Sequence, residues 1–196
     1  MKRRVAILSL VVLASLMSSC GVQKHIGEGD KLLRQNVYDV RMADGSKPPK
    51  EIKEALKGMR QYTAQSPNPQ FLGVRWGMRL YCLAGPEATS GIANYLHKKG
   101  NAPAVYKPEA TYRTASQLQS LLESKGCCTS SVTFDTMNLS DPDMKVVYHI
   151  VPSPRYSIHK VSYEAETEDL RPLLIRWQEE SLLKAGDFYD ADIISS

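Results

Sequence analysis

Alternating and helical spacings of apolar residues predict the elements that follow residue 31. The stretch 32–40 places valine and tyrosine among polar residues and predicts a strand, which the turn formers of 43–49 end. The stretch 50–62 then repeats apolar residues at the i, i+3, i+4 and i+7 spacing of an amphipathic helix. Its apolar positions are Ile52, Ala55, Leu56 and Met59.

The stretch 71–100 follows neither period cleanly, and an irregular insertion is predicted around 66–110. Within it, 91–100 predicts one short helix that ends at Gly100. Two interpretations of a group of arginines and aromatic residues stay open here: a binding surface with stacked cations, or a buried connector whose arginines reach solvent. These residues are Arg75, Trp76, Arg79 and Tyr81.

A helix over 115–125 is predicted from its start, its apolar face and its end. Thr114 and Gln117 have capping-box spacing, in which the two side chains each satisfy a free amide at the helix start. Gly126 supplies the left-handed residue that ends the helix. The apolar face consists of Ala115, Leu118, Leu121 and Leu122.

Three further strands are expected after this helix. The stretches 130–136 and 144–151 alternate in polarity and are joined by a turn at 137–143. A proline-rich boundary at 152–154 precedes a third strand over 155–165. One face of the second of these strands carries Val146, Tyr148 and Ile150, and the other carries Val147, His149 and Val151.

The C-terminal part begins a second set of elements. Asp169 is expected to cap a helix, and Asp190 is expected to cap another helix that barely begins. The apolar residues of the first of these helices are Leu170, Leu173, Leu174 and Trp177. The element order predicts an α+β fold, β-α-α-β-β with an insertion, followed by an incomplete repeat of the same unit.

The start of the chain is typical of an export signal over residues 1–19. Three basic residues at 2–4 precede an apolar run at 5–17, which is shorter than the about 20 residues that a bilayer-spanning helix needs. Small residues stand directly before Cys20, as lipoprotein signal peptidase requires. Lipid attachment at Cys20, with 20–30 as a flexible tether, is one interpretation; an ordinary signal that happens to precede a cysteine is the other.

Removal of the signal lowers the net charge of the chain. The formal net charge is +4, and three of these charges belong to Lys2, Arg3 and Arg4, so the exported chain carries about +1. Acidic and basic residues are interspersed along it, without the basic stripe that nucleic-acid binding needs. The hydrophobic content of 42% is typical of a globular protein.

The reactive residues show no catalytic or metal-binding pattern. Cys82, Cys127 and Cys128 lack the paired spacing of zinc ligands. A bridge between the two neighbouring cysteines would be strained, and a bridge from Cys82 to either stays open beside the plainer interpretation of small buried thiols. The four histidines are scattered, and no GxSxG, P-loop or HExxH motif occurs. We expect no catalytic residue, cofactor, metal or small-molecule substrate.

Four stretches, at 66–81, 111–126, 145–164 and 181–194, resemble the POTRA modules of BamA/TamA-type outer-membrane assembly proteins. The resemblance is strongest to the lipidated, TamL-like members of Bacteroidetes-type bacteria and covers nearly all of the exported chain. It departs from the family at Cys127 and Cys128, where aromatic residues are usual, and no transmembrane barrel is expected in this chain.

The resemblance implies a POTRA-like module over 31–152, with its insertion at 66–110, and the truncated start of a second module over 155–196. It implies a lipid-anchored module in the periplasm at the outer membrane, which binds unfolded outer-membrane proteins or assembly-complex subunits by β-augmentation. The edge strand expected to bind them carries Val132, Thr133, Phe134, Asp135 and Thr136.

Two other functions remain open. A stand-alone periplasmic lipoprotein could use the same module to dock a partner protein. A periplasmic hydrolase would need a histidine or cysteine paired with a carboxylate in a cleft, a pattern that the sequence does not show.

Overall fold

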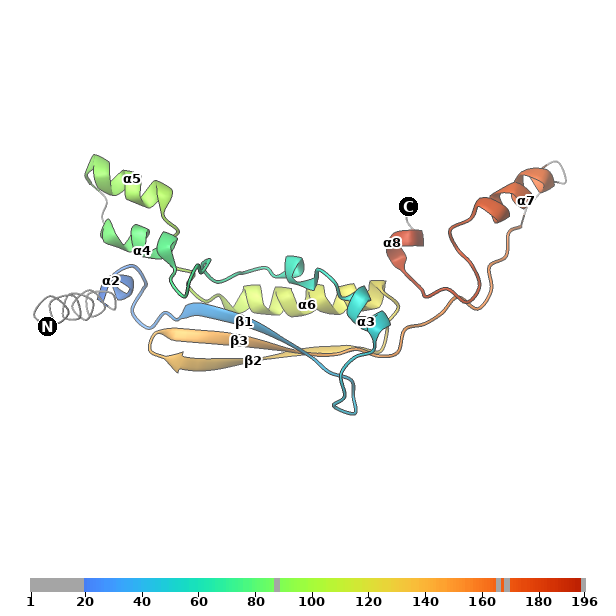
Figure 1. Ribbon diagram of the computed structural model, residues 1–196, viewed down its shortest axis with the longest axis horizontal. Helices are drawn as coiled ribbons and strands as arrows, with labels where there is room; N and C mark the ends of the chain where they lie inside the picture. The colour runs from blue at the N-terminus through green and yellow to red at the C-terminus, as the bar shows by residue number, and fades with distance from the viewer. Residues whose placement is uncertain (1–19, 87–88, 165–166, 168–169, 195–196) are drawn as a thin grey trace, which may run out of the picture. The chain divides into compact units, whose positions relative to one another are not determined.

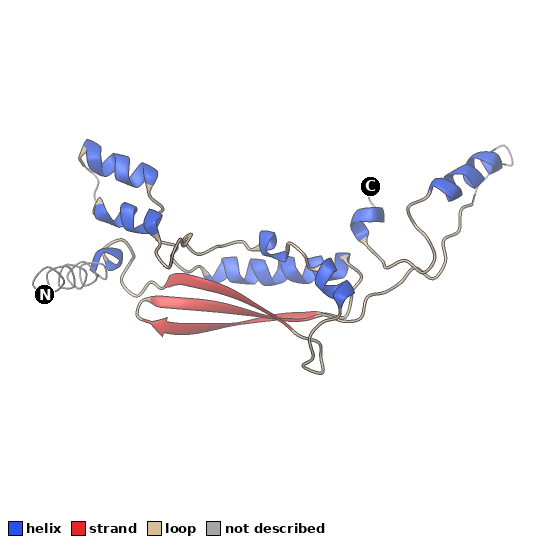
Figure 2. Ribbon diagram, in the orientation of Figure 1, coloured by secondary structure: helices blue, strands red, loops and turns tan. Residues whose placement is uncertain are grey.

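The computed structural model describes residues 20–196 except 87–88, 165–166, 168–169 and 195–196 (Figure 1). The expected export signal and the expected cap at Asp169 lie outside the described residues. The structure is α+β, as the sequence predicts (Figure 2). Its elements are α2 (Cys20–Gln23), β1 (Leu32–Val40), α3 (Lys50–Ala55), the 3-10 helix η1 (Met59–Tyr62), α4 (Trp76–Leu83), α5 (Gly91–Lys99), α6 (Pro108–Ser124), β2 (Ser131–Ser140), β3 (Asp143–Val151), α7 (Arg171–Glu180) and α8 (Ala191–Ile194).

The three strands form one mixed sheet in the order β1-β3-β2. A two-residue turn joins β2 to β3, which makes this pair antiparallel. The β1-β3 pair is parallel, because backbone hydrogen bonds tie the start of β1 to the start of β3 and the end of β1 to the end of β3. The amide of Leu32 donates to the carbonyl of Pro142 at 2.8 Å, and the amide of Arg41 donates to that of Ile150 at 3.0 Å.

The chain folds into two compact units, and the strands run through both. The first unit contains residues up to Val37, then 64–111 and 135–147; the second contains 38–63, 112–134 and 148–196. The expected boundary near 152–155 lies inside the second unit. The amide of Tyr156 donates to the carbonyl of Gly126 at 2.9 Å, which ties the chain beyond this boundary to the end of α6.

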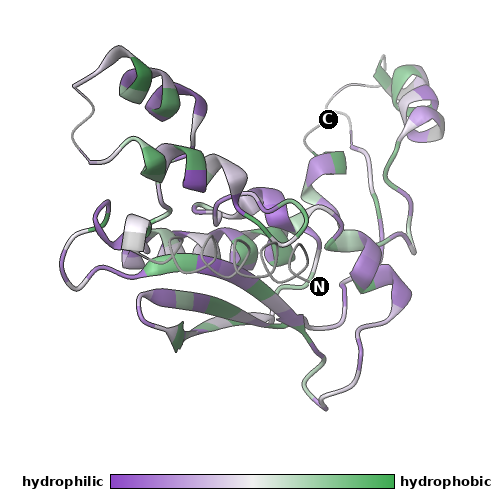
Figure 3. Ribbon diagram, turned by 60° about the vertical axis from the view of Figure 1, so that its left-hand side comes forward, coloured by the Kyte–Doolittle hydropathy of each residue, from purple (hydrophilic) through white to green (hydrophobic). Residues whose placement is uncertain are grey.

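The core of the second unit is formed by α6, α3 and β3. The apolar face predicted for α6 and the alternation predicted for β3 are confirmed, because one face of each is buried. Figure 3 shows hydrophobic and hydrophilic positions alternating along the strands. The buried side chains are Leu118, Leu121 and Leu122 of α6, Tyr148 and Ile150 of β3, and Ile52 and Leu56 from α3 and its C-cap. In the first unit Leu32, Leu33, Met78 and Val146 are buried.

The predicted capping box is wrong, because α6 begins at Pro108 and Thr114 lies buried within the helix. Proline at the first helical position has a preset φ and no amide to satisfy, so the helix starts there without the box. The predicted end is confirmed. Gly126 has a φ of 81°, and the amide of Cys127 donates to the carbonyl of Leu122 at 2.8 Å.

Two other predictions are wrong in extent, and a third predicted element is not formed in the described residues. The helix over 50–62 breaks at Gly58, whose φ of 82° separates α3 from η1. The turn expected at 137–143 is shorter, because β2 continues to Ser140. The strand expected at 155–165 is absent from the described part of that stretch, where Ser157 makes an isolated bridge to Phe188.

The remaining predicted elements are present. The helix at 91–100 is α5, which Ser90 caps and Gly100 ends. The helix after residue 170 is α7, and its apolar residues Leu173 and Trp177 are exposed. The carboxylate of Asp190 accepts from the amide of Asp192 at 3.1 Å at the start of α8.

The segment 20–30, expected to be a flexible tether, contacts the insertion. It begins with α2, and the ring of His25 lies 5.5 Å from that of Tyr81 and hydrogen-bonds the carbonyl of Cys82 at 3.2 Å. Within the described ranges, none of the helices has the length and apolar character that crossing a membrane demands.

Candidate protein-binding edge of the sheet

The strand β2 lies at one edge of the sheet and pairs with β3. An edge strand presents backbone amide and carbonyl groups on its outer side, which can pair with another extended chain. The isolated bridges of the described residues lie elsewhere, at Leu32, Phe71 and Ser157 with their partners, so no loop adds a bridge to β2.

The opposite edge of the sheet, formed by β1, is covered in the first unit. Leu32 forms an antiparallel bridge with Val105. The amide of Leu33 donates to the carbonyl of Ala104 at 2.8 Å, and that of Tyr106 donates to the carbonyl of Lys31 at 2.7 Å. The start of β1 therefore already has a pairing partner on its outer side.

The polar side chains of Asn68, which is buried, and Gln65, which is half-buried, hold this covering segment in place. The side-chain amide of Asn68 donates to the carbonyl of Ala102 at 2.7 Å and accepts from the amide of Ala104 at 2.8 Å. The side chain of Gln65 also donates to the carbonyl of Val105. Because these bonds satisfy backbone groups that flank the bridge, they favour the covered state of β1.

The side chains of β2 divide between a packed face and an exposed face. In the second unit the ring of Phe134 meets that of Tyr112 edge to face at 5.0 Å, and Val132 is half-buried, whereas Thr133 is exposed. In the first unit Asp135 and Thr136 are exposed. The predicted binding residues thus lie on an edge strand, while binding by them stays a prediction.

Two exposed apolar residues of β2 were missed by the sequence reasoning, which placed them in a turn. Met137 is 48% exposed and Leu139 is 53% exposed. They stand at odd positions, whereas Val132 and Phe134 stand at even ones, so the alternation shifts by one residue within the strand. The alternation of Met137 and Leu139 with polar residues was the signal that could have extended the strand.

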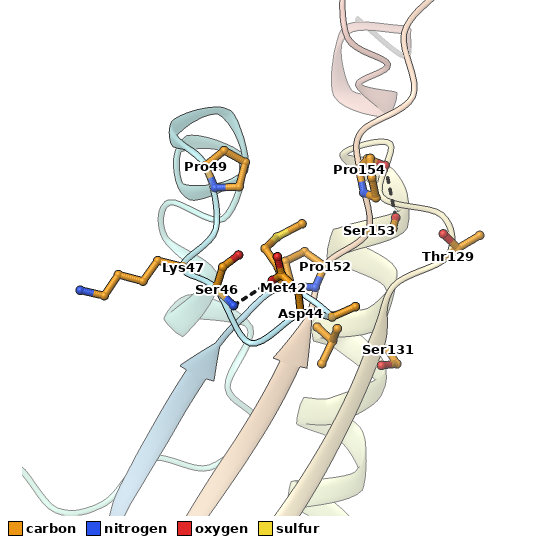
Figure 4. A pocket seen from close by; sticks show the side chains of 12 residues that line it. Met42, Asp44, Ser46, Lys47, Pro49, Thr129, Ser131, Pro152, Ser153 and Pro154 are labelled. Atoms are coloured by element: carbon orange, nitrogen blue, oxygen red, sulfur yellow. Dashed lines mark hydrogen bonds between the residues drawn. The ribbon is translucent and has the colours of Figure 1, made fainter.

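A cavity of about 850 Å³ lies where β2 begins and where β1 and β3 end (Figure 4). Its lining is mainly the turn after β1 and the proline-rich segment after β3. Asp44 borders it, and hydrogen bonds from Ser46 lower the pKa of its carboxyl group. A carboxylate of this kind is ionised at neutral pH, so it stabilises the turn by accepting hydrogen bonds and has no proton to donate.

Cys82, Cys127 and Cys128 are free thiols. Cys127 is buried, Cys82 is half-buried and Cys128 is exposed, so the plainer interpretation of buried thiols fails for Cys128. Burial raises the pKa of the Cys82 thiol. Burial also raises that of Cys127, although the charge of Arg155 opposes it. Both thiols are therefore protonated at neutral pH.

His149 and His97 make structural contacts. The ring of His149 lies 3.9 Å from a carboxylate oxygen of Asp39, and His97 hydrogen-bonds the carbonyl of Gly85 at 3.0 Å. No group of three His, Cys, Asp or Glu side chains with the arrangement of a metal site occurs among the residues described.

The four residues singled out in the insertion do not form a stacked-cation surface. The ring of Tyr81 stacks on that of His97 at 4.1 Å, while Trp76 is exposed. The guanidinium of Arg75 points back to the sheet, where it donates to the carbonyl of Arg34 at 2.7 Å. Arg75 and Arg79 instead line a cavity beside β1 and β3.

No protein-family model and no curated protein matches the chain. A similar solved structure is described as "Crystal structure of Haemophilus Influenzae BamA POTRA3-5", with 9% sequence identity and a TM-score of 0.30. The match covers 87% of this chain and 85% of that chain. Likeness at this level assigns neither a family nor an activity.

Proposed function

We propose that this chain is the periplasmic part of an outer-membrane protein assembly factor, in which β2 binds an extended segment of a client or partner protein. The observation that carries the proposal is the contrast between the two edges of the sheet. The start of β1 is covered by 104–106, whereas β2 has β3 as its neighbour on one side. The POTRA-like stretches of the sequence support the assignment to the outer membrane.

The chemistry of β2 suits clients of many sequences. Backbone pairing supplies affinity that does not depend on the client's side chains. Thr133 and Thr136 are small and polar, and Met137 and Leu139 offer exposed apolar surface to the alternating side chains of an unfolded barrel strand.

Proline substitution on β2 tests this proposal. Adjacent amides of a strand point to opposite sides, so residues 133 and 136, three positions apart, direct their amides to opposite sides. One of the two variants Thr133→Pro and Thr136→Pro therefore removes an outward amide, and the other removes an amide directed at β3. We expect the outward variant to keep its unfolding midpoint and to bind a fluorescent barrel-strand peptide at least about tenfold more weakly. Fluorescence anisotropy and urea unfolding measure the two effects.

Thr89→Pro, in an exposed loop, is the matched control for an added proline. It should leave peptide affinity unchanged. If the outward variant also binds the peptide as the unsubstituted protein does, β2 is not the binding edge and the proposal is wrong.

A further inference from the structure

A second cavity, of about 660 Å³, lies in the first unit and is lined by three arginines. Arg34 comes from β1, Arg75 is the N-cap of α4, and Arg79 lies in the first turn of α4. The lining contains one acidic residue, Asp143, at the start of β3. Residues distant in sequence are thus brought to one polar cavity.

The positive charge of this cavity is only partly compensated. The Nε atom of Arg34 lies 2.7 Å from a carboxylate oxygen of Asp143, and both side chains are largely buried. Three guanidinium groups against one carboxylate leave two positive charges. Desolvation, followed by the charge of Arg34, lowers the pKa of Arg75, which means that the positive form is disfavoured in its present surroundings.

One guanidinium donor in the cavity also lacks an acceptor. The Nε atom of Arg75 is buried and makes no hydrogen bond, whereas the Nε atom of Arg34 faces the carboxylate of Asp143 in their ion pair. The other end of the Arg75 guanidinium is fixed by its bond to the carbonyl of Arg34. Buried donors of this kind cost free energy unless a further group satisfies them.

Exposed apolar side chains adjoin the cavity. Gly73 and Val74 line it, and the tight turn that contains them presents Phe71 and Leu72, which are 68% and 84% exposed. Trp76, 58% exposed, follows directly after Arg75. An anion with an apolar part would contact both kinds of surface.

We propose that this cavity binds a phosphate monoester, either a soluble one or the headgroup of a lipid whose acyl chains lie against Phe71, Leu72 and Trp76. A phosphate monoester carries about −1.5 to −2 charges at neutral pH, which matches the two uncompensated positive charges, whereas a carboxylate would neutralise one. Its three terminal oxygens accept hydrogen bonds from guanidinium groups in the geometry that arginine favours. Leu139 of β2 also lines the cavity, but the arginines that would bind the phosphate lie on β1 and α4, so substitutions outside β2 test this proposal separately from the proposed function.

Isothermal titration calorimetry at low salt tests the proposal with two probes, glycerol 3-phosphate and short-chain dihexanoyl phosphatidic acid. Residues 20–196, which contain every contact described, are titrated with each. We expect saturable binding of one probe molecule per chain. Arg79→Gln should weaken binding at least about tenfold, because a charge-assisted hydrogen bond is lost; Arg79 is exposed, so the fold is retained.

Asp143→Asn should act in the opposite direction and tighten binding several-fold, since it removes the carboxylate that repels the anion. An effect of this sign cannot come from loss of folding. Arg176→Gln, on α7, is the matched control and should leave affinity unchanged.

Trp76→Ser separates the two sources of the phosphate. If it weakens binding of the phosphatidic acid but not of glycerol 3-phosphate, the ligand is a lipid headgroup; if both probes bind alike and Trp76→Ser has no effect, the ligand is soluble. The proposal is overturned if neither probe binds at millimolar concentration, or if Arg79→Gln and Arg176→Gln change the affinity equally.

Discussion

At the scale of single residues, the backbone of Leu72 holds a conformation that residues with a side chain rarely adopt. Its φ is 49°, and that of Gly73 is 78°, while Phe71 and Val74 exchange backbone hydrogen bonds of 2.9 and 3.0 Å. Two positive φ angles define a type I′ turn, whose preferred sequence is Asn-Gly. Leucine therefore stands at a position where asparagine would fold with less strain.

Leu72→Asn should consequently stabilise the protein. We expect the free energy of unfolding to rise by about 1 kcal/mol, the lower end of the cost of a left-handed conformation for a residue with a branched side chain. Urea unfolding at neutral pH measures the change. Leu182→Asn, at a leucine that is 70% exposed, is the matched control and should change the midpoint little. A lower midpoint for Leu72→Asn would mean that the leucine itself stabilises the turn.

At the scale of elements, an ion pair joins the end of α6 to the start of α8. The Nζ atom of Lys125 lies 2.9 Å from Oδ1 of Asp190 and 2.7 Å from a carboxylate oxygen of Asp192. Burial lowers the pKa of Lys125, but the hydrogen bonds and charges of the two aspartates outweigh it and raise the pKa above the ordinary value. The C-terminal segment is therefore held by a charge that is mostly shielded from water.

The stabilisation from this pair should depend on pH in one direction. A raised folded-state pKa means that the contribution is complete below the unfolded pKa of about 10.4 and is lost as the pH rises through the folded pKa. Lys125→Met should lower the free energy of unfolding by about 2 kcal/mol at pH 7 to 9. The difference from the unsubstituted protein should shrink above about pH 10.5.

Urea unfolding across this pH range checks the prediction. Lys160→Met, at an exposed lysine, removes the same charge without the buried pair and should cost under about 0.5 kcal/mol at every pH. A loss for Lys125→Met that stayed constant to pH 11.5 would show that packing, not the ion pair, holds the segment.

At the scale of the whole molecule, the proposed lipid anchor makes the location of the protein depend on Cys20. Stable membrane attachment takes more than one acyl chain, which a triacylated cysteine supplies. Cys20→Ala should leave the fold intact and move the protein from the membrane pellet to the soluble fraction of its host. Ultracentrifugation measures the distribution between pellet and soluble fraction, and mass spectrometry of the N-terminus detects the lipid. Retention of Cys20→Ala in the membrane pellet would exclude lipid anchoring at this residue.

Cys128→Ala is the control for loss of an exposed thiol and should stay in the membrane pellet with the unsubstituted protein. The peptide affinity of the same variant separates the effect on location from an effect on binding. The peptide affinity of β2 should be equal in the Cys20→Ala protein and the unsubstituted one, because Cys20 does not belong to the sheet.

Elements whose signals are local could be predicted from the amino-acid sequence. The bounds of β1, the buried alternation of β3, the apolar face of α6 and its end at Gly126 follow from spacings within a few residues, and all are present. The start of α6 and the length of β2 were misjudged where two local signals competed. Pro108 begins the helix ahead of a capping-box motif, and the shift in alternation after Phe134 hides the continuing strand.

Long-range contacts determine which edge of the sheet is open and which charges share a cavity. The cover on β1 depends on hydrogen bonds between residues about 70 positions apart, and the arginine cavity joins Arg34 and Arg75 to Asp143. Local propensity acts over one or two turns of chain, so it contains no information on such pairings. They arise because backbone groups of both β1 and the insertion need hydrogen-bond partners. The bridge between Leu32 and Val105 supplies them in one place, and the guanidinium of Arg75 satisfies the carbonyl of Arg34 in another.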